Sequence, residues 1–222
     1  KPDVSYARHF QTILRREPDV VMVGECMDRE TAHLAAKAAI DGKKIYVGIP
    51  SKDSVDALKK FVSLCADSDV ASAALAGISS QRLIRKLCPA CREAYKPDAA
   101  LLKKANIPAK NVDVFYRART EPVLDKKGRP VLCTNCQGSG HYGRVAVFEL
   151  MIMNDAIREL IRNGQPANVI QKECRKSGMR FLQEVGLQLV IKGVTSMNEI
   201  IRGMRDEESA APVGAVEDSS ED

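Results

Sequence analysis

Four cysteines, arranged as two close pairs, are the residues whose type and spacing most directly indicate chemistry. They stand in the segments Cys88-Pro89-Ala90-Cys91 and Cys133-Thr134-Asn135-Cys136. Each Cys-x-x-Cys turn can supply two thiolates, and two such turns complete the closed tetrahedral sulfur shell that structural Zn²⁺ prefers. The sequence therefore predicts a structural zinc site made by all four of these cysteines.

The residues around the two pairs are consistent with a metal site. The 41 residues between the pairs exceed the spacing of about 15 to 20 in a zinc ribbon, so the motif is less specific than a ribbon would be. Three glycines suit a tight knuckle and three basic residues can offset thiolate charge: Gly138, Gly140, Gly143, Arg85, Lys86 and Lys96. Four reduced cysteines without metal remain an alternative. A catalytic dithiol is disfavoured because nothing nearby resembles a thioredoxin unit.

A second candidate site follows the short apolar run at 20–23, where Gly24 and then Glu25 stand. Ligands of parallel α/β sheets lie beyond the carboxyl ends of the strands. Glu25 could therefore orient water or magnesium beside a bound nucleotide. The plainer alternative is that this carboxylate belongs to the N-cap region of the next helix, and the sequence does not separate the two.

The phosphate-binding pattern Gly-x-x-x-x-Gly-Lys-Ser/Thr is absent from the 222 residues. Without the backbone amides and the lysine of that loop, ATP has no anchor in this chain. The three histidines, His9, His33 and His141, are far apart in sequence and are expected at the surface or at caps rather than in catalysis. We therefore expect no ATP turnover by these residues alone.

The elements that would position Glu25 form a βαβ unit. We expect a helix over 4–16, ended by Glu17-Pro18-Asp19, because the residue before a proline avoids helical geometry. The run at 20–23 is typical of a strand buried on both faces, as in parallel sheets. A helix over 29–40 and a second strand over 45–47 complete the unit, which implies a right-handed crossover and a parallel sheet.

The rest of the chain divides into segments of different composition and periodicity. Helices are expected over 54–65 and 71–87, and a small zinc-organised subdomain over 86–145. Beyond it, helices over 154–163, 167–177, 181–192 and 197–204 form a helical C-terminal region at 146–205. The acids and small residues of 206–222 indicate an unfolded tail.

Composition limits the function further. No run of about 18 apolar residues exists, so we expect a soluble, cytoplasmic protein. Residues 206–222 hold seven acids and no base, which leaves 34 bases and 22 acids, a net charge of +12, in residues 1–205. The bases lack aromatic interleaving, so nucleic-acid binding is disfavoured, although acidic lipid headgroups or an acidic protein remain possible partners. Cys26, Cys65 and Cys174 are expected to be free buried thiols.

Several of these segments, taken together, resemble one family. They are the run from Ile13 through Glu17-Pro18-Asp19 to Gly24-Glu25, then Glu30-Thr31-Ala32, Ser80-Gln81-Arg82-Leu83, both cysteine pairs, Gly140-x-x-Gly143-Arg144, Phe148-Glu149-Leu150, Gly178-Met179-Arg180 and Lys192-Gly193-Val194-Thr195. In this order they resemble the type II secretion and type IV pilus assembly ATPases. The resemblance covers about residues 5–204.

This resemblance implies an α/β fold, namely the C-terminal half of a RecA-like P-loop ATPase domain with a four-cysteine zinc subdomain and a C-terminal helical region. Residues 1–85 would be the second half of the ATPase domain. Gly24-Glu25 would end the Walker B segment, with Gly24 beside the nucleotide and Glu25 polarising the attacking water. The family implies ATP and Mg²⁺ as cofactors. It also implies a hexamer peripheral to the inner membrane, whose partners are an inner-membrane platform protein and cytoplasmic adaptor proteins.

Three departures from the family pattern leave two interpretations open. Cys26 and Met27 replace an isoleucine and an arginine, and Pro50 stands where a histidine box has its histidine. The phosphate-binding loop, expected upstream of residue 1, is missing. In one interpretation the chain is a fragment of an active motor ATPase. In the other it is an inactive, zinc-stabilised structural or regulatory module of the same machinery.

Overall fold

The computed structural model describes residues 5–104, 114–119 and 121–204, so the tail expected at 206–222 lies outside the described residues. The chain forms two compact units. The first comprises Lys1–Gln81 and Val147–Val185, and the second comprises Arg82–Ala146 and Gly186–Asp222. Within the described residues no helix has the length and apolarity needed to cross a membrane.

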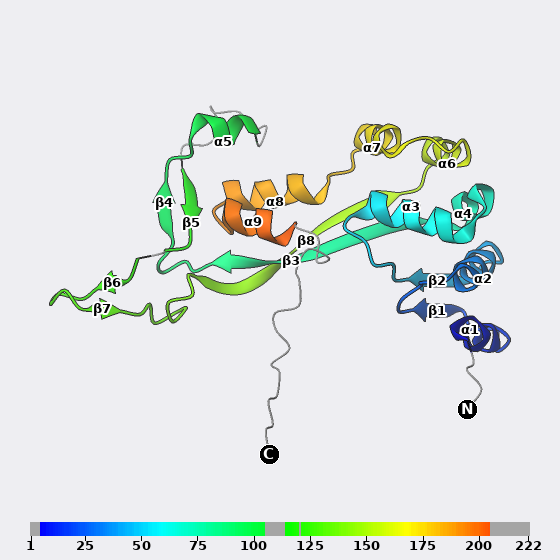
Figure 1. The fold of residues 1–222 in the computed structure, drawn as a ribbon, viewed down its shortest axis with the longest axis horizontal. Coiled ribbons are helices and arrows are strands. Elements are labelled where there is room, and N and C mark those ends of the chain that lie inside the picture. Colours follow the sequence, from blue (N-terminus) through cyan, green and yellow to red (C-terminus); the bar gives the residue numbers. More distant parts are fainter. Residues whose placement is uncertain (1–4, 105–113, 120, 205–222) are drawn as a thin grey trace, which may run out of the picture. The chain divides into compact units, whose positions relative to one another are not determined.

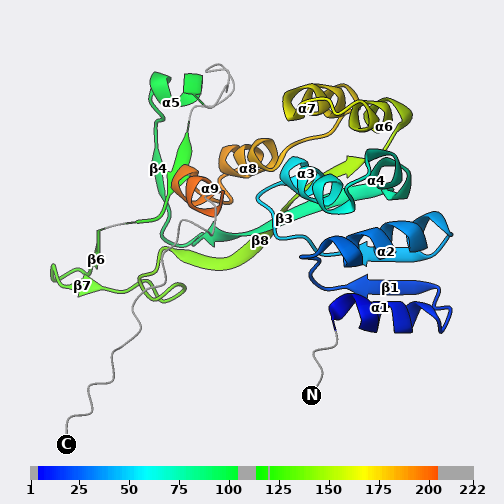
Figure 2. The same ribbon diagram turned by 45° about the vertical axis from the view of Figure 1, so that its right-hand side comes forward.

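The first unit begins with the expected βαβ arrangement. Helix α1 (Tyr6–Leu14) precedes strand β1 (Val20–Val23), helix α2 (Arg29–Ile40) and strand β2 (Lys44–Val47). Strands β1 and β2 pair in parallel, in a register that places Val20 opposite Lys44 and Val23 opposite Val47. Figures 1 and 2 show the two strands side by side, next to α1 and α2. The parallel pairing predicted from the sequence is thus confirmed.

The prediction that β1 is buried on both faces is wrong for the residues described. Val21 and Val23 are buried in a cluster with Phe10 and Ala35, whereas Val20 and Met22 are 55% and 75% exposed. The pair β1-β2 forms a two-stranded sheet, and its helices pack against one face. Only the alternate side chains that point to that face are therefore covered.

The first unit also holds helices α3 (Ser54–Cys65), α4 (Ser68–Ala74), α6 (Asp155–Arg162) and α7 (Ala167–Lys176). A second core holds Leu58 of α3, Ile157 of α6 and Ile170 of α7 against Met151. The expected helices at 54–65, 154–163 and 167–177 are therefore confirmed to within one residue at each end.

The helix expected over 71–87 is wrong. Helix α4 ends at Ala74, and Gly77–Leu87 forms strand β3, which pairs with strand β8 (His141–Ile152). A Cβ atom on Gly77 would lie 2.9 Å from the carbonyl oxygen of Met151, so the two backbones approach closely there. This pairing joins segments more than 50 residues apart, so the helix propensity of the local sequence cannot predict it.

The second unit holds residues 82–87 of β3, residues 141–146 of β8 and several short elements. These are β4 (Glu93–Tyr95), α5 (Ala99–Lys104), β5 (Phe115–Arg117), β6 (Val123–Leu124), β7 (Pro130–Val131), part of α8 (Leu182–Ile191) and α9 (Met197–Gly203). Strands β4 and β5 pair antiparallel, as do β6 and β7. Helices α8 and α9 match those expected at 181–192 and 197–204.

A buried carboxylate holds α9 against β3 in this unit. Glu199 accepts hydrogen bonds from the backbone N–H of Arg85 at 3.0 Å, from the Arg85 guanidinium at 2.7 Å and from the Arg202 guanidinium at 2.6 Å. Burial alone would raise the pKa of Glu199, but the two guanidinium groups hold that pKa well below its usual range. The Glu199 carboxylate is therefore charged and fully paired.

Candidate metal centre and candidate nucleotide edge

Each cysteine pair lies in a tight turn of the second unit. Cys88 and Cys91 follow β3, where the N–H of Cys91 donates to the Cys88 carbonyl at 3.4 Å. Cys133 and Cys136 precede β8, and the N–H of Gln137 donates to the Cys133 carbonyl at 2.7 Å. A bond of 2.9 Å from the Cys88 N–H to the Gly140 carbonyl joins the two turns. The backbone itself thus brings the pairs together.

The glycines after the second pair have the conformations that a knuckle needs. Gly138, Gly140 and Gly143 have φ values of 86°, 69° and 73°, in the left-handed region that glycine tolerates best. At Gly140 a Cβ atom would also lie 2.7 Å from the Cβ of Ala118. The backbone at these glycines therefore forms tight turns, as the sequence suggests.

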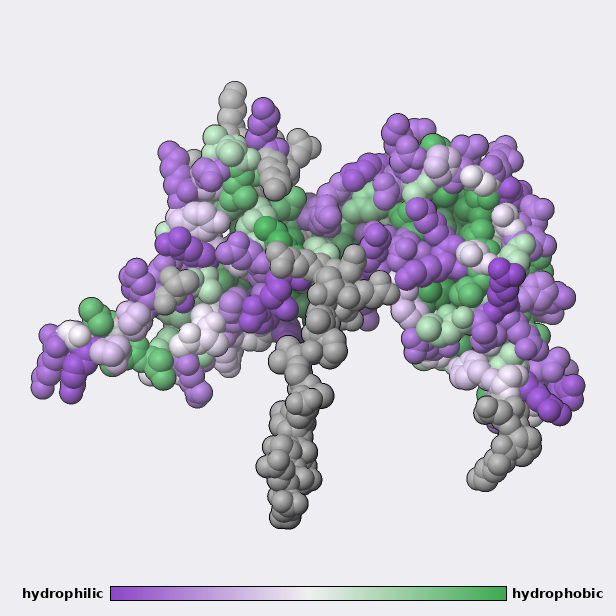
Figure 3. Space-filling view, in the orientation of Figure 1, coloured by the Kyte–Doolittle hydropathy of each residue, from purple (hydrophilic) through white to green (hydrophobic). Residues whose placement is uncertain are grey.

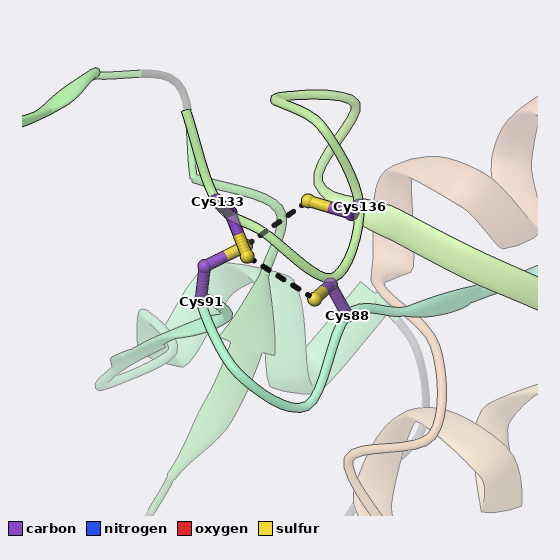
Figure 4. A group of neighbouring side chains, drawn as sticks. All are labelled: Cys88, Cys91, Cys133 and Cys136. Carbon is purple, nitrogen blue, oxygen red and sulfur yellow. Dashed lines mark hydrogen bonds between the residues drawn. The ribbon is translucent and has the colours of Figure 1, made fainter. Parts of the chain in front are cut away.

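The four thiol groups converge on one point, as Figure 4 shows. Their sulfur atoms all lie within 4.8 Å of one another. The Sγ atoms of Cys88 and Cys133 are 3.8 Å apart, and those of Cys91 and Cys136 are 3.5 Å apart. A tetrahedral ZnS₄ centre with Zn–S bonds of about 2.3 Å has sulfur atoms about 3.8 Å apart. The donor set and its spacing therefore fit Zn²⁺.

The environment of the thiols favours partial ionisation. Burial alone would raise the pKa of Cys88, but donors from Asn135 and Ala90 and the neighbouring thiols lower that pKa to about 6. The Asn135 amide donates to the Cys88 sulfur at 3.2 Å. Burial and the neighbouring sulfurs raise the pKa of Cys91 instead. A divalent cation would stabilise all four thiolates together.

Arg85 has another role than the sequence analysis predicts, and Asn135 has a role that the sequence analysis does not assign. Arg85 was expected to offset thiolate charge, but its guanidinium is engaged by Glu199. The sequence interpretation also missed Asn135, whose amide lies inside the second Cys-x-x-Cys turn and contacts a sulfur of the first. Its position between two ligands is the signal that could have identified it.

The candidate nucleotide edge lies in the first unit, at the carboxyl ends of β1 and β2. The Gly48 N–H donates to the Val23 carbonyl, and the Cys26 N–H donates to the Gly48 carbonyl, both at 2.9 Å. A Cβ atom on Gly48 would lie only 2.0 Å from the carbonyl oxygen of Gly24. The two strand ends are therefore in direct backbone contact, and both Gly24 and Glu25 are exposed beside them.

The N-cap of α2 is Asp28 and not Glu25. One carboxylate oxygen of Asp28 accepts from the Thr31 N–H at 2.8 Å, and the other accepts from the Thr31 hydroxyl at 2.7 Å. Within the described part of the chain, Glu25 makes no hydrogen bond or ion pair. The capping role is thus filled by another residue, and the Glu25 carboxylate faces solvent.

The loop between β2 and α3 is held at several points. The Lys60 ammonium donates to the Pro50 carbonyl at 2.7 Å, and the Asp53 side chain caps α3 by accepting from the Asp56 N–H at 2.8 Å. The segment that carries Pro50 therefore has a defined backbone next to Gly24 and Glu25.

Glu149 is a buried carboxylate that sequence reasoning recognised only as part of a motif. One oxygen accepts from the N–H of Ser54 at 2.6 Å and the other from the N–H of Leu182 at 2.9 Å. Ser54 and Leu182 are the first residues of α3 and α8, so one side chain satisfies both helix starts. Its signal was the alternation in β8, where Val147 and Met151 are also buried.

The other three cysteines are free and buried, as expected. Burial raises the pKa of Cys65 to about 11, and it raises the pKa of Cys26 and of Cys174 as well. These thiols are therefore protonated near neutral pH and poorly reactive. His9 and His141 each have a ring nitrogen within hydrogen-bonding distance of a nearby backbone carbonyl.

Comparison with known proteins identifies the same family over nearly the whole chain. A model of the family described as "Type II/IV secretion system protein" matches residues 1–202. The type II secretion system protein E of Pseudomonas aeruginosa is 32% identical over 207 residues, which are 93% of this chain and 39% of the relative. The type IV pilus assembly ATPase PilB of Thermus thermophilus is 33% identical over 198 residues, or 89% of this chain and 21% of that protein.

Solved structures agree on the fold. The pilus retraction motor PilT with bound ADP superposes with a TM-score of 0.58 at 23% identity, covering 92% of this chain and 45% of PilT. The ATPase DotB of Legionella pneumophila gives a TM-score of 0.56 at 15% identity, covering 89% and 42%. The chain thus spans less than half the length of each of these proteins.

Proposed function

The chain belongs to the Type II/IV secretion system protein family, and from this premise we propose that it is the C-terminal part of a cytoplasmic motor ATPase that powers type II protein secretion or type IV pilus assembly. Related proteins over about nine tenths of the chain are named as type II secretion proteins and pilus assembly ATPases. Residues 1–85 would be the second half of the RecA-like domain, residues 86–145 the zinc subdomain and residues 146–205 the helical region.

The observation that carries the proposal is the edge formed by β1 and β2. There the exposed Glu25 follows a buried parallel strand and is relieved of helix capping by Asp28. In the proposed motor, Glu25 would polarise the attacking water, and Gly24 would lie beside the nucleotide without a side chain in the way. Mg²⁺ would neutralise charge on the phosphates of ATP.

These 222 residues do not by themselves fit ATP, because they contain no phosphate-binding loop. Phosphate binding in the proposed motor therefore comes from residues outside this sequence.

The four-cysteine centre has a structural role in this proposal. Four sulfur ligands close the tetrahedral shell of Zn²⁺ and leave no position for water or substrate. Cys88, Cys91, Cys133 and Cys136 would hold the metal, which joins the turn after β3 to the turn before β8. The bound ion would therefore contribute folding free energy to the second unit.

The family further supports a hexameric assembly on the cytoplasmic side of the inner membrane. Its partners would be an inner-membrane platform protein and cytoplasmic adaptor proteins, and the chain would contact the membrane through them. Nucleic acid is not a proposed partner.

A second candidate is an inactive structural or regulatory module of the same machinery. It is favoured by Pro50, which stands in place of the histidine of the histidine box, and by Cys26 and Met27 after Glu25. The carbonyl of Pro50 accepts a hydrogen bond from the Lys60 ammonium, which holds this loop.

The experiment that separates the candidates uses a protein that carries these residues together with an upstream phosphate-binding loop. In an active motor, Glu25→Gln should abolish ATP hydrolysis and leave ATP binding unchanged. Absence of hydrolysis in the unsubstituted protein, with ATP binding and one zinc per chain retained, would favour the inactive module. Hydrolysis by the 222-residue chain alone that vanishes with Glu25→Gln would contradict the assignment of phosphate binding to outside residues.

A further inference from the structure

The hairpin of β6 and β7 is a solvent-exposed part of the second unit. Its strands pair Val123 with Val131 and Leu124 with Pro130. The Asp125 carboxylate stabilises the turn by accepting from the N–H of Lys127 at 2.8 Å and from the N–H of Arg129 at 2.9 Å. Between residues 124 and 132 every side chain except that of Asp125 is exposed. The hairpin is thus ordered by its turn rather than by burial.

This hairpin presents apolar and cationic side chains together. Leu124 and Leu132 are 60% and 71% exposed, and Figure 3 shows hydrophobic and hydrophilic residues side by side on it, at the lower left. A two-stranded hairpin with no covering layer is marginally stable in water. Exposed apolar side chains beside several positively charged side chains indicate a surface that another segment covers.

Two of the cations in the turn have no counter-ion among the residues that the structure describes. Arg129 pairs with Asp125 at 2.9 Å. The ammonium groups of Lys126 and Lys127 meet no carboxylate within the part of the chain that the structure describes. The segment that covers the hairpin is therefore expected to be anionic, with some apolar side chains.

The chain itself contains such a segment directly after α9, which lies in the same unit. Residues 206–222 carry seven acids and no base. The acids form two groups, at 206–208 and 217–222, separated by a stretch that includes Val213 and Val216. This order of charges and apolar residues complements the lysines and exposed leucines of the hairpin.

Length does not prevent the contact. Residues 205–222 can extend over about 60 Å, whereas a compact unit of about 100 residues has a radius of gyration of about 13 Å. Tethering also gives the segment an effective concentration of about millimolar, which favours it over a free anion of equal affinity.

We propose that the acidic segment 206–222 binds the β6-β7 hairpin of its own chain, with its carboxylates on Lys126 and Lys127 and its valines against the exposed leucines. While bound, the segment covers the basic hairpin and competes with any other anionic partner for it. Because the contact is electrostatic and near the surface, it weakens as salt shortens the Debye length.

Nuclear magnetic resonance of the full 222-residue chain tests the proposal through two reciprocal variants. In the first, Lys126→Gln with Lys127→Gln, the amide signals of Gly214 and Ser220 should move toward their high-salt positions. The shift difference between low and high salt should fall about threefold or more for these signals. In the second, the seven acids of 206–222 are changed to Asn and Gln, and the amide signal of Gly128 should respond in the same way.

The matched control is Lys59→Gln with Lys172→Gln. It removes the same charge from exposed helical positions of the first unit, and it should leave the tail signals unchanged. The proposal would be overturned if the amide signals of residues 206–222 changed neither with salt nor in the hairpin variant. It would also be overturned if these signals changed as much in the control variant as in the hairpin variant. Shifts that disappear on dilution would also overturn it, because the occupant would then be a second copy of the chain.

Discussion

The two units of this chain are stabilised in different ways. Of the 32 buried hydrophobic residues within the described part of the chain, 23 lie in the first unit and nine in the second, and two of those nine are the cysteines Cys88 and Cys136. The first unit is stabilised mainly by burial of apolar surface, spread over two cores. The strands that lie wholly in the second unit are shorter. The stability of this unit depends more on a few polar contacts, namely those among the four cysteines and the ion pairs of Glu199.

The difference predicts where single substitutions cost most stability. Free energy from apolar burial is distributed over many side chains, so no one of them is decisive. Free energy from a metal centre is concentrated in one ion and four ligands. The contrast between the two units can be tested by single changes in each.

Removal of the proposed zinc ion should show the difference in stability between the two units most clearly. We expect a chelator, or Cys88→Ser, to unfold mainly the second unit, because a structural zinc ion contributes on the order of 10 kcal/mol to folding. Amide signals of the second unit should disperse poorly while those of α2 and α3 persist. Cys174→Ala, which removes a buried thiol in the first unit, should leave the metal content unchanged and cost about 1 kcal/mol. Retained metal in Cys88→Ser would contradict the site.

Gly48→Ala should be the most damaging single change at the strand ends of the first unit. Its Cβ atom would meet the Gly24 carbonyl oxygen at 2.0 Å, so β1 and β2 must separate. We expect a loss of about 3 kcal/mol in urea unfolding. Gly24→Ala is the matched control, because nothing lies within 4 Å of its Cβ position. Equal losses for both substitutions would show that backbone approach is not the cause.

Glu149→Ala tests whether one polar contact can matter in the well-packed unit. Loss of the carboxylate leaves the N–H groups of Ser54 and Leu182 without acceptors in a buried place, at a cost of about 2 to 4 kcal/mol. Glu149→Gln keeps one oxygen acceptor and should cost less. Denaturant unfolding of the two variants measures the difference, and indistinguishable stabilities would argue against the double cap.

The unfolding free energy of the second unit should depend on pH through the ionisation of Glu199. Its pKa is lowered in the folded state, so its contribution is present above the unfolded value of about 4.3 and is lost as pH falls below it. We expect a loss on the order of 1 to 2 kcal/mol between pH 5 and about pH 3. Glu199→Gln should remove that part of the dependence. An unchanged acid profile in the variant would contradict the assignment.

Glu25→Gln should have the smallest effect on folding. The side chain is exposed and makes no hydrogen bond or ion pair with the described residues, so the unfolding free energy should change by less than about 0.5 kcal/mol. Thermal unfolding of the two proteins checks this. A larger loss would mean that Glu25 has a structural role and would weaken its proposed place in the nucleotide edge.

Local signals in the sequence predicted much of this molecule. Asp28 and Asp53 cap the first turns of α2 and α3, and the expected helices begin directly after these two residues. The two Cys-x-x-Cys turns and the following glycines likewise depend on residues a few positions apart. Such features are predictable because their hydrogen bonds close within one turn of the chain.

Other features were decided only by the tertiary structure. The segment Gly77–Leu87 is a strand because β8 pairs with it from far along the chain. Glu149 has its role because two distant helices begin beside it. The exposure of Val20 and Met22 follows from which face of β1 the helices cover. Local patterns in the sequence thus account for the helix starts and the cysteine turns. Long-range packing sets the strand pairing and the burial, because those free energies depend on partners that no local pattern specifies.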